Sequence, residues 1–101
     1  MATTPEGKVK TAVKKRLKEL GVWFCMPMGT GFGNSGVPDF LCCWEGQFLA
    51  IETKAPGKRS NTTTLQDIQI AGINRAGGIA VVIDDAAQLE PIFGARHAHQ
   101  T

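Results

Sequence analysis

The chain of 101 residues contains no tyrosine, only two histidines and three cysteines, and no long apolar run. No segment approaches the roughly 18–20 apolar residues that a membrane span requires. The opening residues MATTPEGKVK lack the apolar region of a secretory signal. Cys42 and Cys43 are adjacent and Cys25 is the third cysteine, a pattern that suggests free thiols rather than a disulfide framework. We therefore expect a cytoplasmic protein with no membrane partner.

Common cofactor motifs are also missing or incomplete. Residues 29–36, GTGFGNSG, contain G-x-G-x-x-G, but Pro38 and a strand pattern follow where a dinucleotide site needs a helix. No G-K-[ST] is present, so we expect neither a P-loop nor a nucleotide cofactor. His97 and His99 form an H-x-H pair, yet no C-x-x-C or H-x-x-x-H spacing supports a zinc site. The glycine-rich segment is interpreted as a loop.

Positive charge is concentrated in the first part of the chain. The net charge is only +2, but residues 1–60 hold nine Lys and Arg against five Asp and Glu, whereas residues 61–101 hold two against four. Six of the basic residues lie between Lys8 and Lys18. Such a cluster is typical of a surface that faces phosphates. The alternative is a solvated helix face that keeps the protein soluble.

Capping residues and apolar periodicity predict a single domain with helices and strands in alternation. A helix begins around Thr4, Pro5 and Glu6 and ends at Gly21, with an apolar stripe along it. Strands are expected at 22–26, 40–44, 48–54 and 79–83, with a hairpin turn at 45–46. A second helix is expected from 62–64 to about 76, and a short last helix after 84–85. The order αβββαβ(α) implies a mixed central sheet flanked by helices, in one domain 1–101 with a core at about 4–94 and a tail at about 95–101.

The predicted hairpin carries three charged residues, Asp39, Glu52 and Lys54. Glu52 and Lys54 share one strand face, and antiparallel pairing brings Asp39 close to Glu52. Two neighbouring carboxylates repel each other unless a cation or a proton lies between them, and Mg²⁺ needs only one or two protein carboxylates. Lys54 could hold an attacking water or stabilise charge at phosphorus. The alternative is a structural salt bridge between Lys54 and either carboxylate.

The motifs P-D at 38–39 and E-T-K at 52–54 resemble the PD-(D/E)xK nuclease superfamily. The fuller pattern includes Glu6 in the first helix, G-V-P-D-F at 36–40, I-E-T-K at 51–54 and Gln66 in the following helix. This pattern is similar to the VRR-NUC (virus-type replication-repair nuclease) family, and to its small stand-alone phage and bacterial members. The resemblance covers about residues 4–85 and implies a restriction-endonuclease-like core of the α/β (α+β) class.

The resemblance also implies a role for each motif residue. Asp39 and Glu52 would bind Mg²⁺ or Mn²⁺, with the main-chain carbonyl of Thr53 as a third ligand. Lys54 would be the catalytic lysine near the attacking water. Glu6 would assist metal or water binding, although it could simply be a partner of the helix dipole.

The remaining assignments concern the second helix and the DNA. Gln66 would orient the site or a phosphate, its alternative being an ordinary amide on a helix surface. The loop at 29–36 could approach the DNA backbone. DNA phosphates would be contacted by five basic residues, Lys10, Lys14, Lys18, Lys58 and Arg59.

The implied function is that of a metal-dependent DNA endonuclease. The small family members resemble homodimers that cut branched DNA such as four-way junctions, so we expect structure-selective cleavage by a homodimer. Two alternatives are a non-catalytic DNA-binding protein on a nuclease scaffold and a restriction- or mobile-element-type endonuclease. The intact D…E-x-K motif argues against the non-catalytic alternative.

Overall fold

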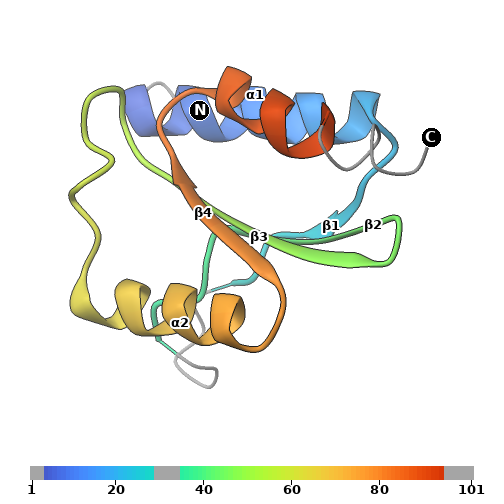
Figure 1. The fold of residues 1–101 in the computed structure, drawn as a ribbon. Coiled ribbons are helices and arrows are strands. Elements are labelled where there is room, and N and C mark those ends of the chain that lie inside the picture. Colours follow the sequence, from blue (N-terminus) through green and yellow to red (C-terminus); the bar gives the residue numbers. More distant parts are fainter. Residues whose placement is uncertain (1–3, 29–34, 95–101) are drawn as a thin grey trace.

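A computed structural model describes residues 4–28 and 35–94, which form a mixed four-stranded sheet between helices (Figure 1). Strands β1, β2 and β3 are antiparallel neighbours, and β4 runs parallel to β3 at the end of the sheet. This arrangement confirms the predicted α+β fold and its element order. None of the helices in the described residues is both long and apolar enough to cross a membrane. The elements are α1 (Pro5–Glu19), β1 (Trp23–Cys25), β2 (Phe40–Trp44), β3 (Gln47–Thr53), α2 (Thr64–Arg75), β4 (Ile79–Ile83) and η1 (Ala86–Leu89).

Local sequence signals set the ends of these elements. Thr4 caps α1 by accepting a hydrogen bond from the Gly7 amide at 3.0 Å, which satisfies one of the free donors of the first helical turn. Thr63 caps α2 in the same way. Glu45 and Gly46 both have positive φ angles, 50° and 79°. Two positive angles are typical of a type I′ hairpin turn, whose twist matches that of the flanking strands.

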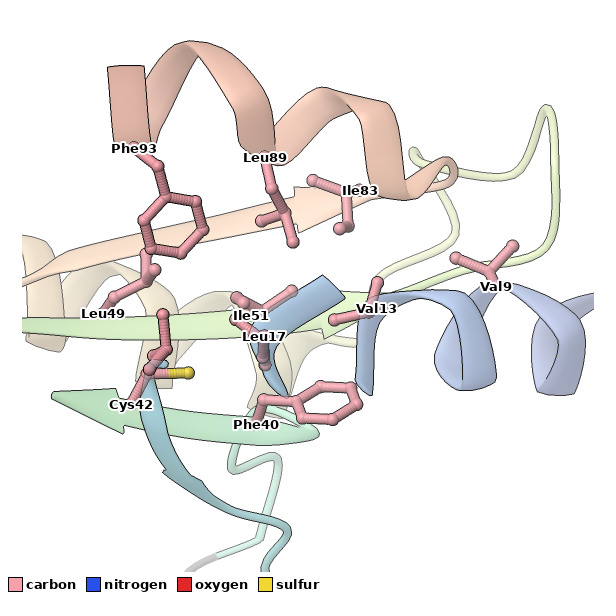
Figure 2. Packing of buried hydrophobic residues seen from close by; sticks show 11 residues of the cluster. Val9, Val13, Leu17, Phe40, Cys42, Leu49, Ile51, Ile83, Leu89 and Phe93 are labelled. Carbon is pink, nitrogen blue, oxygen red and sulfur yellow. The ribbon is translucent and has the colours of Figure 1, made fainter. Parts of the chain in front are cut away.

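The hydrophobic core lies between the sheet and the layer formed by α1 and η1 (Figure 1). Because side chains alternate along β3, Leu49 and Ile51 point into this core together with Leu17 of α1 (Figure 2). A fully buried side chain of this size contributes about 2 kcal/mol to stability. The same alternation turns Glu52 and Lys54 away from the core, toward α2.

Helix α2 covers the other face of the sheet near β3 and β4 (Figure 1), and it has no fully buried side chain. Leu65 and Ile68 remain 52% and 59% exposed. Polar contacts fasten the helix near both ends. Near its C-terminus, Asn74 accepts from the Ala80 amide at 2.9 Å and donates to the Ala80 carbonyl at 3.2 Å. Near its N-terminus, Gln66 contacts the end of β3, where the candidate site lies.

Candidate active site at the end of strand β3

The candidate site lies where β3 ends and β2 begins. The pairing of Phe40 with Ile51, continued by one residue, sets Asp39 opposite Glu52 as the hairpin predicted. Glu52 is 3% exposed and Lys54 is 9% exposed. Charged side chains are rarely buried to this extent unless they are paired or serve a function. Their partners therefore decide how the site can work.

Asp39 is held by Thr53 through one of its two carboxylate oxygens. Its Oδ2 accepts from the Thr53 amide at 3.0 Å and from the Thr53 hydroxyl at 2.6 Å. The Lys54 amide bonds to Ile83 of β4 at 2.8 Å, so the preceding residue, Thr53, directs its own amide and carbonyl toward β2. The other oxygen of Asp39, Oδ1, lies 3.7 Å from the ammonium of Lys10 on α1.

Gln66 links the two charged side chains of β3. Its Nε2 donates to Glu52 Oε2 at 3.1 Å, and its Oε1 accepts from the Lys54 ammonium at 3.0 Å. Lys54 is also 3.5 Å from Glu52 Oε2. Gln66 is itself fixed, because its Oε1 accepts from the Thr63 amide at 3.0 Å and its own amide donates to the Thr63 hydroxyl at 3.1 Å. The capping box of α2 therefore orients the charged pair, a role beyond that of a surface amide.

The second oxygen of Glu52, Oε1, is buried and has no hydrogen-bond partner among the described residues. Burial raises the pKa of Glu52 to about 7; the nearby Asp39 adds to the rise and Lys54 opposes it. A buried carboxylate oxygen without a partner costs free energy that a bound cation would recover.

The available donors suit a hard divalent cation. They are Glu52 Oε1, Asp39 Oδ1 and the main-chain carbonyl of Thr53, all of them oxygen atoms as Mg²⁺ and Mn²⁺ prefer. No three His, Cys, Asp or Glu side chains in residues 4–28 and 35–94 converge to hold a metal. Two protein carboxylates nevertheless match what Mg²⁺ commonly uses, since water completes its coordination.

An open cleft of about 630 Å³ runs along α1 and is lined by Glu6, Lys10 and Lys14, with Met26 across from them. The charge of Glu6 adds slightly to the raised pKa of Glu52, so Glu6 is within electrostatic reach of the site. Its role as a metal ligand stays a prediction. Lys18, which was predicted to contact DNA, does not line this cleft.

Lys58 and Arg59 lie exposed in the loop that follows β3. Asp84, at the end of β4, holds this loop by accepting a hydrogen bond from the Gly57 amide at 2.8 Å. The contact keeps the pKa of Asp84 below its usual value, with Gln88 and Arg59 contributing further. The loop is thus tied to the sheet on the side where β3 ends, and its predicted role in DNA contact remains open.

Gly36 brings the segment that leads to Asp39 against α2. Its φ angle is +80°, and a Cβ atom there would lie 2.4 Å from the main-chain carbon of Leu65 and 2.7 Å from the Gln66 amide nitrogen. Gln69 adds a bond from its Nε2 to the Ser35 carbonyl at 3.3 Å. Only glycine permits this approach. The sequence pattern did not indicate this contact, because it assigned Gly36 only to a glycine-rich loop.

The structure brings the predicted residues Asp39, Glu52, Lys54 and Gln66 together. Sequence reasoning did not find the contact of Lys10 with Asp39, because only the packing of α1 on the sheet creates it. Cys42 is buried, the other two cysteines are exposed, and all three are free thiols as expected. The loop residues 29–34 and the pair His97 and His99 lie outside the described residues.

Among the solved structures that resemble this chain are two VRR_NUC domains. One, described as a VRR_NUC domain, has a TM-score of 0.70 and 25% sequence identity, and covers 91% of this chain and 97% of its own. Another, a VRR_NUC domain protein, has a TM-score of 0.71 and 18% identity, with coverage of 94% and 89%. No family model and no curated protein matches the sequence. The first structural match, together with the P-D motif before β2 and the E-x-K motif that ends β3, supports membership of the VRR-NUC family, whose domain implies a nuclease of the PD-(D/E)xK type.

Proposed function

We propose that this domain is a Mg²⁺- or Mn²⁺-dependent endodeoxyribonuclease that selects branched DNA by its structure. The observation that supports the proposal best is the buried Glu52, whose Oε1 has no partner among the described residues, while Asp39, opposite it in the hairpin register, binds Thr53 through Oδ2 and not through Oδ1. A salt bridge alone leaves that oxygen unexplained, because Lys54 and Gln66 both contact Oε2. A cation between the two carboxylates accounts for it.

In this proposal Asp39, Glu52 and the carbonyl of Thr53 would hold the cation. When bound, the cation would polarise the phosphodiester and neutralise the charge that develops during hydrolysis. A hydrogen bond to Gln66 Oε1 holds the Lys54 ammonium beside Glu52. From this position the ammonium can orient the attacking water by hydrogen bonding and stabilise negative charge on the phosphate. The burial of Lys54 strengthens this interaction because little water screens it.

Two features bear on the choice of DNA. Lys10 and Lys14 line the cleft along α1, and Lys10 contacts Asp39 of the site. The positive charges of these lysines suit a phosphate backbone. A domain of 101 residues has little surface with which to read base edges, so recognition through shape and backbone is favoured. We include in the proposal that two copies act as a homodimer, because two sites related by a two-fold axis match the symmetry of a four-way junction.

The proposal is tested by cleavage of linear, flapped and four-way DNA with Mg²⁺, with Mn²⁺ and with chelator, together with a sizing measurement. Cleavage should require the cation and should be fastest on branched DNA. Glu52→Gln removes a ligand charge at constant shape, and Lys54→Met removes the ammonium while it keeps the aliphatic stem. Both variants should fold and lose cleavage by at least about 100-fold, the scale of a single catalytic group.

Asp67→Asn is the matched control, since Asp67 is an exposed carboxylate next to Gln66 in sequence. It should cleave like the wild type. DNA binding without cleavage under every cation would favour a non-catalytic binding protein, and full activity of either site variant would refute the assigned roles. Efficient cutting of linear DNA at one sequence would instead point to a restriction-type enzyme.

A further inference from the structure

We propose that Lys10 is a resident cation that occupies Asp39 until DNA draws it away, so that metal and DNA bind cooperatively. The inference rests on the proposed function. Its basis is the 3.7 Å contact between the Lys10 ammonium and Asp39 Oδ1. This is the oxygen of Asp39 that Thr53 leaves available, and the same oxygen would hold the metal.

The two lysines near the site are held very differently. Lys54 is buried and bonded to Gln66 at 3.0 Å, so its position is fixed. The Lys10 side chain is 36% exposed, and its distance from Asp39 exceeds the range of a good hydrogen bond. Lys10 stands on α1 and lines the open cleft next to Lys14. Its long stem can therefore move its charge from Asp39 into the cleft at little cost.

Lys10 and the divalent cation compete for Asp39 Oδ1, and a DNA phosphate competes with Asp39 for Lys10. Without DNA, Lys10 lowers the affinity of Asp39 for a divalent cation, since the two positive charges repel each other. A phosphate in the cleft offers Lys10 another partner and frees Oδ1. By thermodynamic reciprocity, a bound metal must strengthen DNA binding by the same factor by which DNA strengthens metal binding.

The expected size of the effect follows from the exposure of the pair. Partly exposed ion pairs are weak, and removal of this one should tighten metal binding by about two- to fivefold. High salt should shrink the difference because it screens the exposed ammonium.

The experiment measures the Mn²⁺ affinity of the DNA-free protein from the electron paramagnetic resonance signal of free Mn²⁺. The proteins are the wild type, Lys10→Met, the control Lys14→Met and the site variant Glu52→Gln. Lys10→Met should bind Mn²⁺ about two- to fivefold more tightly than the wild type. Lys14→Met removes a charge from the same cleft without an Asp39 contact and should match the wild type.

A second arm repeats the titration with a four-way junction present, with Lys54→Met in every protein so that the DNA stays intact. The junction should raise Mn²⁺ affinity when Lys10 is present and raise it less in Lys10→Met. If the wild type and Lys10→Met bind Mn²⁺ with equal affinity while Glu52→Gln does not bind it, the inference is overturned and the proposed function stands. If the wild type shows no saturable Mn²⁺ binding that Glu52→Gln abolishes, the proposed function itself is overturned.

Discussion

Replacement of Gly36 by alanine should show whether the contact between the Asp39 segment and α2 builds the site. The new Cβ would lie 2.4 Å from the Leu65 carbon and 2.5 Å from its oxygen. Main-chain atoms cannot give way as a flexible side chain can, so either α2 or the segment before Asp39 must move by about 1 Å to restore ordinary contact.

The expected cost has two parts. An alanine with a φ angle of +80° costs about 1–2 kcal/mol relative to glycine, and overpacking adds about 1–3 kcal/mol. Gly36→Ala should therefore lower the free energy of unfolding by about 2–5 kcal/mol. Gly57 provides a matched control, because its φ angle is also +80° while, apart from its own atoms and its two chain neighbours, no heavy atom of residues 4–28 and 35–94 lies within 4 Å of its Cβ position. Gly57→Ala should cost only the first part.

Urea unfolding of both variants measures the difference, and cleavage of branched DNA measures its effect on function. A shift of about 1 Å in Asp39 or Gln66 should lower cleavage about 100-fold, whereas Gly57→Ala should retain activity. If Gly36→Ala is as stable as Gly57→Ala to within about 0.5 kcal/mol, the close approach does not exist in solution and the reasoning fails.

Two further predictions concern charge. Because burial raises the pKa of Glu52 from 4.5 to about 7, the folded protein binds this proton more tightly than the unfolded chain. The metal-free protein should thus lose stability as the pH rises through this range, by at most about 3 kcal/mol. Glu52→Gln should flatten the profile in urea titrations, and an unchanged profile would assign it to another group. For DNA binding, Lys14→Ala should reduce the salt slope by about 1, while Lys18→Ala, which lies outside the cleft, should leave the slope unchanged; equal effects would show that the DNA does not follow the cleft.

The hairpin was predictable from the sequence because its determinants are local. The turn at 45–46 sets the register, the two-residue alternation of strands sets the faces, and together they place Asp39 opposite Glu52. The caps of both helices were predictable for the same reason, since Thr4 and Thr63 accept hydrogen bonds from amides in the first turn of the helix that each one caps. The resemblance of the motif then singled out Gln66, which periodicity alone leaves as a surface amide.

Other features depend on how distant segments pack, and local patterns do not encode that. The crossover from β3 to the parallel strand β4 places α2 over the end of β3, and only then can Gln66 meet Glu52. Gly36 contacts Leu65 for the same reason. In the sequence, a glycine that permits close packing looks the same as a glycine in an ordinary loop.

The order of the elements, the hairpin and the charged residues at its open end therefore follow from local patterns in the sequence. The tertiary structure alone decided which oxygen of each carboxylate remains available. Thr53 occupies one oxygen of Asp39, Gln66 and Lys54 occupy one oxygen of Glu52, and Lys10 reaches the site from another layer. These assignments follow from the packing of α1 and α2 on opposite faces of the sheet, where the burial of apolar side chains sets the positions and the charged groups adapt to them.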